Sequence, residues 1–149
     1  GVRVAALCHW PGQSKAGLTC AVPIITMDWA ASIAAAAGVE LAVDGVDLRP
    51  LLRGEGMEPR SLFWHYPHYH PGGATPYSAM RQGNLKLLHF FEDQRLELYD
   101  LAADPEEKND LSTAQRETAL ALSAQLDIWR TQVAAQAPRL NPDYDPAAK

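Results

Sequence analysis

The spacing of hydrophobic and polar residues changes after the first 56 residues of this chain. Residues 1–56 hold one long apolar run and one helix-spaced group. From Ser61 onward, short aromatic and apolar runs alternate with glycine- and proline-containing segments. Gly54, Gly56 and Pro59 lie between the two regions and favour a surface loop. We therefore predict two structural parts, residues 1–56 and residues 57–149.

Two short apolar elements are expected in the first part. Val2–Trp10 is an apolar run without a helical period that ends at Pro11, which is typical of a buried strand. Leu48–Leu52 is a second apolar element, interrupted by Pro50. Because a buried strand without partner strands leaves an exposed apolar edge, the first element favours a fragment or an associating species over an independent module.

A short helix is predicted over Met27–Ala37. Trp29, Ile33 and Ala36 share one face at the four- and three-residue spacing of a helix. Gly38 follows directly and supplies a C-terminal stop.

The second part predicts a small antiparallel sheet. Four short runs that contain aromatic or aliphatic residues are separated by turn residues, and Gln82-Gly83-Asn84 joins two of them as a hairpin turn. The segment from His68 to Pro76 contains two glycines and two prolines and can only be a loop. The four predicted strands are Leu62–Tyr66, Ser78–Arg81, Leu85–Phe91 and Leu96–Leu101.

A long helix is predicted after the sheet. Ser112 followed by Gln115 is a capping-box signature, and Pro138 ends the helical pattern after about 24 residues. An apolar stripe at helical spacing predicts the buried face: Ala119, Leu122, Leu126, Trp129 and Val133. The predicted fold class is α+β, with an antiparallel sheet of about four strands packed on a long C-terminal helix.

Composition and charge exclude several classes of partner. The 149 residues include 13 Lys and Arg against 18 Asp and Glu, so a net charge of -5 favours neither nucleic acid nor an anionic membrane. No apolar run approaches the roughly 20 residues of a membrane span. Gly1–Pro11 lacks the pattern of a secretory signal. Cys8 and Cys20 could form a disulfide, but two cysteines define no framework, and we expect free thiols.

The clearest candidate chemistry lies in a histidine-rich segment. His65, His68 and His70 fall within six residues and could bind a metal or an anionic sugar. If the segment before Pro67 is a strand, the three imidazoles do not share one side, which disfavours a preformed zinc site. A histidine-dependent metallohydrolase would also need nearby carboxylates, and the closest acids, Glu58 and Glu92, are at no recognisable motif spacing. A surface aromatic-histidine loop is the structural alternative.

Acidic residues cluster between the last strand and the long helix. Asp104, Glu106, Glu107 and Asp110 do not match the spacing of a calcium-binding loop. Carboxylates are favourable near the positive end of a helix, so we interpret this segment as a helix-entry loop.

Several motifs follow one another along the chain. Ser78–Leu88 holds Arg-Gln-Gly-Asn-Leu-Lys-Leu, Arg95–Leu101 holds Leu-Tyr-Asp-Leu, and Asp104–Leu111 holds Asp-Pro-Glu-Glu-Lys-Asn-Asp-Leu. Upstream, Asp28 opens the first helix and Asp44–Leu52 reads Asp-Gly-Val-Asp-Leu-Arg-Pro-Leu-Leu. In this order and spacing, the motifs resemble the C-terminal portion of a type I, formylglycine-dependent sulfatase of the alkaline-phosphatase-like superfamily.

The resemblance implies a fold and a function. Residues 1–56 would be the last strand and helix of the large α/β domain, and residues 57–149 the C-terminal subdomain. The complete enzyme would hydrolyse a sulfate ester of a carbohydrate or aryl alcohol, using calcium and formylglycine. Its nucleophile motif, cysteine or serine-x-proline-x-arginine, is absent from this sequence. No catalytic or metal-binding residue is therefore assigned, and the chain alone is expected to be inactive.

The resemblance also suggests substrate contacts, a compartment and partners. The subdomain borders the active-site cleft in such enzymes, so His65 and His68 are candidate substrate-binding residues. A periplasmic or secreted location is implied. A sulfated small molecule or glycan is the expected ligand of the complete enzyme. Self-association, or pairing with the N-terminal domain, is expected of the chain itself. The alternatives are a phosphoester or phosphonate hydrolase of the same superfamily and a stand-alone, non-catalytic interaction module.

Overall fold

The chain forms two compact units, Gly1–Pro59 and Arg60–Lys149, in a computed structural model that describes residues 4–139 and 141–143. The predicted boundary after residue 56 lies in the loop just before this division. Its assignment to two domains of a longer protein stays a prediction. Within the described ranges, no helix combines the length and the apolar character that a bilayer crossing requires.

The N-terminal segment does not form the predicted strand. Residues 4–10 have no regular structure, and the side chains of Val4 and Leu7 are 83% and 100% exposed; Val2 and Arg3 lie outside the described residues. A strand is stable only when its backbone groups pair with a neighbour, and no residue from 4 to 59 is in a strand. The prediction of a strand is therefore wrong for the described residues of this segment. An apolar run can become a strand only where partner strands are available, and this unit has none among its described residues.

The first unit instead contains two helices, α1 (Met27–Ala36) and α2 (Arg49–Leu52). Helix α2 forms within Leu48–Leu52, which the sequence predicted only as a short apolar element. Pro50 lies at the start of this helix, where a missing N–H costs nothing. The predicted apolar face of α1 is wrong: Ile33 is 61% exposed, whereas Asp28 and Ser32 are fully buried. The burial of these two polar residues follows from the hydrogen bonds described below.

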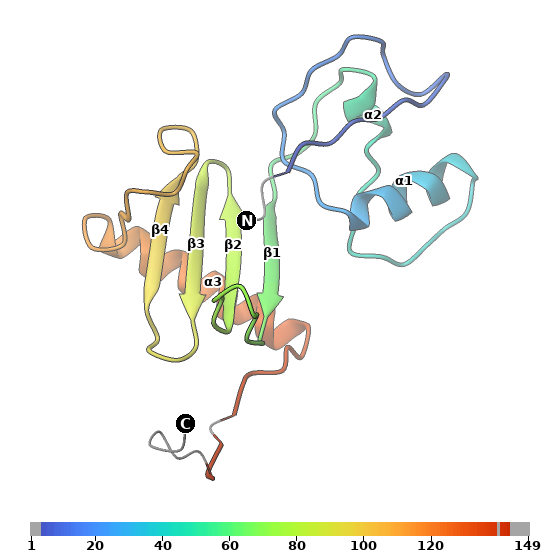
Figure 1. The fold of residues 1–149 in the computed structure, drawn as a ribbon. Helices are drawn as coiled ribbons and strands as arrows, with labels where there is room; N and C mark the ends of the chain where they lie inside the picture. The colour runs from blue at the N-terminus through green and yellow to red at the C-terminus, as the bar shows by residue number, and fades with distance from the viewer. Residues whose placement is uncertain (1–3, 140, 144–149) are drawn as a thin grey trace. The chain divides into compact units, whose positions relative to one another are not determined.

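The second unit contains the predicted antiparallel sheet. Its strands lie side by side in the order β1 (Ser61–Tyr66), β2 (Tyr77–Gln82), β3 (Leu85–Phe90) and β4 (Leu96–Asp100) (Figure 1). All neighbouring pairs are antiparallel. Gly83 in the β2–β3 turn has φ 58°, a left-handed conformation that glycine adopts without strain. The prediction of about four strands is confirmed.

Helix α3 (Arg116–Gln132) lies against one face of the sheet (Figure 1). The predicted stripe is confirmed up to Trp129, and its buried members pack with three strand residues in one core: Met80, Leu87, Leu98, Ala119, Leu122 and Leu126. Val133 lies beyond the helix and is 47% exposed. The helix has 17 residues, fewer than predicted, since Ala134 turns the chain at φ 50°.

The predicted capping box is also wrong. The residue before α3 is Gln115, and it makes no side-chain capping hydrogen bond. The Ser112 hydroxyl donates to Asp110 Oδ2 at 2.9 Å instead. The Ser112 backbone N–H, which the Gln115 side chain would accept in a capping box, donates to Asp110 Oδ1 at 2.8 Å. The carboxylate two residues earlier replaces the glutamine as the acceptor, and the helix begins at Arg116, three residues later than predicted.

Strand alternation separates the side chains into two sets. Phe63 stacks on Trp129 of α3 at 4.9 Å between ring centroids, so odd-numbered positions of β1 face the helix. His65 therefore shares the helix-covered face with Phe63, while Tyr66 lies on the opposite face.

Candidate functional site

His65 lies near the end of β1 on the face that α3 covers. Its Nδ1 is 2.8 Å from Ser78 Oγ on β2, and its Nε2 is 2.8 Å from the carbonyl oxygen of Gln136. A carbonyl oxygen can only accept, so Nε2 carries a proton, and in the neutral ring Nδ1 accepts from the Ser78 hydroxyl. Both ring nitrogens of His65 are thus engaged, and the ring ties the segment after α3 to β1.

Phe91 provides an aromatic surface beside His65. The two rings meet edge to face at 5.7 Å between centroids. The guanidinium of Arg130 on α3 lies 5.1 Å from the centre of the same ring, and it is paired with Asp127 one turn earlier. A cation over an aromatic face is attracted by the ring's quadrupole, so Arg130 is held in place by two partners.

A second histidine lies next to this cluster. His89 on β3 is the cross-strand partner of Ser78, as His65 is on the other side. Arg130 Nη2 lies 3.3 Å from His89 Nδ1, and His89 Nε2 lies 3.1 Å from Gln94 Oε1. Because a guanidinium only donates, His89 Nδ1 accepts and its Nε2 donates to the amide oxygen.

An open pocket of about 460 Å³ lies where these groups meet the end of α3. Its chemistry is mixed, with imidazole, guanidinium, carboxylate and hydroxyl groups around an aromatic side chain. Such a combination can donate to and accept from the hydroxyl groups of a sugar. The lining residues are His65, Phe91, Asp127, Arg130, Thr131, Ala134, Ala135 and Ala137.

His68 lies elsewhere, in the exposed loop after β1. Its ring packs edge to face on Tyr66 at 5.6 Å between centroids. Since Tyr66 is on the face opposite His65, the structure does not bring the two predicted substrate-binding histidines together. His68 is exposed to solvent, and no hydrogen bond within the described residues engages its ring.

The rest of the loop is organised by its own contacts. His70 Nδ1 accepts the backbone N–H of Gly72 at 2.9 Å, which closes a tight turn. The Tyr69 hydroxyl donates to Glu92 Oε1 at 2.7 Å. Each imidazole of the histidine-rich segment therefore has a different environment, and the geometry does not support a three-histidine metal site.

The acidic loop binds backbone groups. Asp104 Oδ2 accepts the N–H groups of Lys108 and Asn109 at 2.8 and 2.7 Å. Asp110 Oδ1 accepts the N–H groups of Leu98 and Ser112 at 3.0 and 2.8 Å. Burial raises the pKa of Asp110, but these hydrogen bonds outweigh it and leave the pKa below its ordinary value. The interpretation as a structural helix-entry loop agrees with these bonds.

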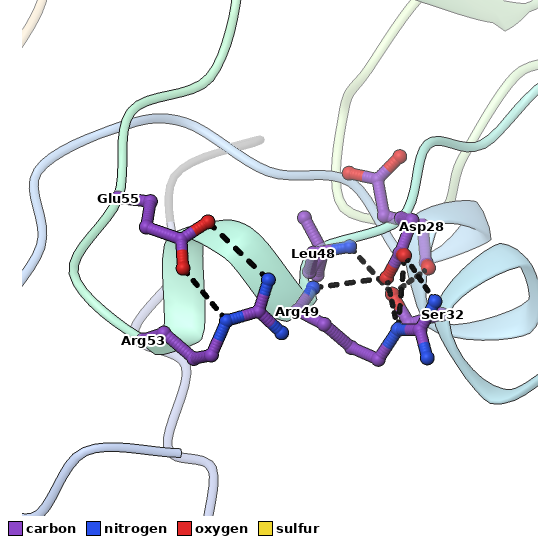
Figure 2. A network of polar contacts seen from close by, with 7 residues as sticks. Asp28, Ser32, Leu48, Arg49, Arg53 and Glu55 are labelled. Carbon is purple, nitrogen blue, oxygen red and sulfur yellow. Dashed lines mark hydrogen bonds and ion pairs between the residues drawn. The ribbon is translucent and has the colours of Figure 1, made fainter. Parts of the chain in front are cut away.

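A buried polar network organises the first unit, and Figure 2 shows its members. The Asp28 carboxylate accepts the backbone N–H groups of Ile25 and Val46 at 2.8 and 3.1 Å. The Ser32 hydroxyl donates to the Asp28 carbonyl at 2.6 Å and accepts from the Leu48 N–H at 2.8 Å. These side chains join α1 to the segment leading into α2, so their role is structural.

Ion pairs surround the same network. Arg49 binds both carboxylate oxygens of Asp47 at 2.7–3.0 Å, and this hydrogen bonding lowers the pKa of Asp47. Arg53 pairs with Glu55 at 2.8 Å, and this pair is also drawn in Figure 2.

The two cysteines of the chain, Cys8 and Cys20, are free thiols, as expected from the sequence.

Comparison with known proteins identifies the family. The family model described as "N-sulphoglucosamine sulphohydrolase, C-terminal" matches residues 1–133. The chain belongs to the sulfatase family as a C-terminal domain. Two relatives agree with this assignment. N-acetylglucosamine-6-O-sulfatase of Bacteroides thetaiotaomicron is 32% identical over 117 residues, which are 73% of this chain and 21% of the relative. Arylsulfatase A of Homo sapiens is 40% identical over 108 residues, 70% of this chain and 20% of the relative.

A solved structure shows the same fold with a ligand. It is a protein in complex with its substrate D-glucosamine-2-N,6-O-disulfate, with 28% identity and a TM-score of 0.57. The match covers 74% of this chain and 24% of that chain. The sulfatase domain described here therefore spans about a fifth of the length of its curated relatives.

The sulfatase family implies calcium and formylglycine in complete enzymes. The residues of this domain do not fit either group. Within residues 4–139 and 141–143, no three His, Cys, Asp or Glu side chains are grouped so that they could hold a metal ion. Cys8 and Cys20 are followed two residues later by Trp10 and Val22, where the nucleophile motif requires proline. No catalytic step is therefore assigned to this domain.

The sequence identified only part of the cluster of side chains around the pocket beside His65. His65 stood out because of its histidine neighbours, but His89, Phe91 and Arg130 did not. The alternating pattern of β3 places His89 on the helix side, and this is the one signal that could have pointed to it. The contact between His65 and residue 136 spans 71 positions and has no local signature.

Proposed function

We propose that this domain belongs to an enzyme that hydrolyses a sulfate ester on a carbohydrate, and that it forms part of the wall of the substrate cleft. The match of the sulfatase C-terminal family model to residues 1–133 carries this proposal. One relative is an N-acetylglucosamine-6-O-sulfatase, and one solved neighbour is in complex with its substrate D-glucosamine-2-N,6-O-disulfate. Both support a sulfated amino sugar over a simple aryl sulfate as the substrate.

His68 is the proposed direct contact to substrate. It is exposed, and its ring packs only edge to face on Tyr66, so its nitrogens can reach a sugar hydroxyl or a sulfate oxygen. A hydrogen bond of this kind contributes about 0.5–1.5 kcal/mol, and more if the imidazole is charged.

His65 is proposed to contact substrate in a different way. Its Nε2–H already donates to the carbonyl of Gln136, which belongs to an exposed segment. A substrate oxygen can replace that carbonyl oxygen as the acceptor, while Ser78 keeps the ring in the same orientation. His65 would then exchange a contact within the domain for a contact with the ligand.

The domain by itself is proposed to be inactive. It has no nucleophile motif, and its described residues offer no metal-binding group. Incubation of the purified chain with 4-nitrophenyl sulfate and calcium tests this directly. We expect no turnover above that of buffer, and activity that copurifies with the monomeric chain would contradict the proposal.

Partners and compartment follow from the same reasoning. Residues 4–37 expose apolar side chains, including Val4, Leu7 and Ile33, which favours self-association or pairing with an N-terminal sulfatase domain. Sedimentation over a concentration series should show association, and a monomer at all concentrations would argue against it. A periplasmic or secreted location is proposed and can be tested by fractionation of the producing cells.

Substitution of the two histidines tests the recognition role in the complete enzyme. Because the nucleophile lies elsewhere, His68→Ala should raise KM on a sulfated amino sugar several-fold, at one tenfold step per about 1.4 kcal/mol. His65→Ala should do the same, while both variants should keep most of their activity on 4-nitrophenyl sulfate. A large and equal loss of kcat on both substrates would instead place one of these histidines among the catalytic residues.

A phosphoester or phosphonate hydrolase is the alternative within the same superfamily. The family model and both relatives described above are sulfatases, so the alternative is less well supported. Comparing 4-nitrophenyl sulfate with the corresponding phosphate, using the complete enzyme, separates the two. An interaction module without any catalytic partner would show neither activity in the complete protein.

A further inference from the structure

We propose that a row of aromatic side chains across the sheet, on the face opposite α3, binds the pyranose units next to the sulfated sugar of an oligosaccharide. The row consists of Tyr66, Tyr77 and Phe90, extended by Arg95 at one end and His68 at the other. The choice of a carbohydrate rests on the proposed function, whereas the row itself rests on the geometry of the sheet.

The register of the sheet places these rings in one line. Tyr66 on β1 is the direct partner of Tyr77 on β2, which is the direct partner of Phe90 on β3. The ring centroids are 5.9 and 6.0 Å apart along the line, and the rings are tilted by 42° and 44°. The Phe90 N–H donates to the Arg95 carbonyl at 2.9 Å, which places Arg95 beside Phe90 at the end of the row.

Both ends of the row are polar. The guanidinium of Arg95 lies 4.0 Å from the centre of the Phe90 ring. It forms ion pairs with the carboxylates of Asp93 and Glu97. At the opposite end, His68 meets Tyr66 edge to face at 5.6 Å. The row therefore begins at the residue that we propose as the direct substrate contact and continues across the sheet.

Stabilisation of the sheet explains part of this arrangement, because aromatic cross-strand pairs stabilise antiparallel sheets. It does not explain the polar groups. The three rings are only half-buried, and neither the Tyr66 nor the Tyr77 hydroxyl has a hydrogen-bond partner within the part of the chain that the structure describes. Both hydroxyls are therefore available to donate to and accept from a ligand.

These features fit a chain of sugar units. The C–H groups on one face of a pyranose can pack on an aromatic ring, and its hydroxyls can bond to phenol hydroxyls at the edges. Arg95 shares its surroundings with two carboxylates, so the far end of the row suits neutral sugar hydroxyls better than a second sulfate.

The experiment uses the 149-residue chain and unsulfated probes. Chitotetraose, a chain of four N-acetylglucosamine units, is titrated into the labelled protein, and amide shifts are followed by NMR. N-acetylglucosamine alone serves as the short probe. We expect shifts concentrated around Tyr66, Tyr77 and Phe90, with the tetrasaccharide bound about tenfold more tightly than the single sugar, which corresponds to about 1.4 kcal/mol.

Substitutions separate binding from folding. Tyr77→Ala should weaken tetrasaccharide binding by about tenfold, and Tyr77→Phe, which keeps the ring, should retain most of it. Tyr69→Ala is the matched control, since Tyr69 is an exposed tyrosine bonded to Glu92 outside the row. If Tyr77→Ala does not fold, the wild-type shift map and Tyr77→Phe still decide.

Three results would overturn the proposal: no shifts with millimolar chitotetraose, shifts confined to the pocket beside His65 and Arg130, or equal affinity for one and four sugar units. Failure here is distinguishable from failure of the proposed function. Because these probes carry no sulfate, an unresponsive row together with a raised KM for His68→Ala in the complete enzyme would leave the recognition role of His68 intact.

Discussion

Removal of the carboxylate that pairs with Lys86 should destabilise the second unit. The Lys86 side chain is 4% exposed, and its Nζ lies 2.5 Å from Glu107 Oε2 in the acidic loop. Glu107→Gln leaves a nearly buried ammonium without its counter-charge. Breaking a fully buried pair costs about 3–5 kcal/mol. Glu107 is 26% exposed, so water can compensate in part, and the new amide still offers an oxygen. We therefore expect a loss of about 2 kcal/mol.

The neighbouring residue provides a matched control. Glu106 pairs with Lys108, but both side chains are well exposed, at 65% and 72%. Exposed pairs contribute about 0–1 kcal/mol, so Glu106→Gln, which makes the same change in charge, should have little effect. The free energy of unfolding is measured by urea denaturation with tryptophan fluorescence as the signal. For a unit of about 90 residues, 2 kcal/mol also corresponds to a fall in Tm of about 8–16 °C.

A second substitution tests the physical reason. If the loss comes from an uncompensated charge, the double variant Lys86→Met, Glu107→Leu should recover most of the stability that Glu107→Gln loses, because it removes both charges. Equal effects of Glu106→Gln and Glu107→Gln would refute the reasoning. A double variant as unstable as Glu107→Gln would show that the shape of the loop, which has φ 58° at Glu107, matters more than the charge.

Three further predictions follow from other contacts. Asp28→Ala leaves two backbone N–H groups without their acceptor and should cost about 2–3 kcal/mol in urea unfolding, whereas Asp44→Ala at an exposed position should be nearly neutral. The pKa of Asp110 is lower in the folded state than its ordinary value of 3.8, so its ionised form stabilises the fold above that pH, and this stability is lost as the pH falls through the folded pKa. Asp110→Asn should therefore weaken the acid dependence of unfolding, and an unchanged acid limb would contradict this. Trp129→Ala removes the ring stacked on Phe63 and should cost about 3 kcal/mol, measured by thermal unfolding; a loss below 1 kcal/mol would mean that α3 repacks without it.

The second unit was predictable in outline because its signals are local. Short aromatic and apolar runs bounded by turn residues such as Gly83 located the strands, and the stripe from Ala119 to Trp129 located the buried face of α3. The family motifs also lie in continuous stretches of sequence. The helix start was missed because Asp110 accepts the Ser112 backbone N–H in place of Gln115, a competition between two nearby acceptors that a motif does not resolve.

The first unit shows where local signals fail. The apolar run before Pro11 has the composition of a strand, but a strand depends on backbone partners, which are absent from the described residues of this unit. Similarly, the helical spacing of Trp29 and Ile33 predicted a buried apolar face. The Asp28 carboxylate found two backbone N–H groups 3 and 18 residues away, and these bonds made burial of the polar face favourable.

The sequence by itself therefore determined the sulfatase family, the four strands and the helix that packs on them, because each depends on residues close together in the chain. Only the tertiary structure decided which histidines have free nitrogens. It bonded both nitrogens of His65, one of them to a carbonyl 71 residues away, and left His68 exposed on the other face of the sheet. It also aligned three aromatic rings from separate strands into one row. Strand register brings distant residues together, and no local pattern of residues records that register.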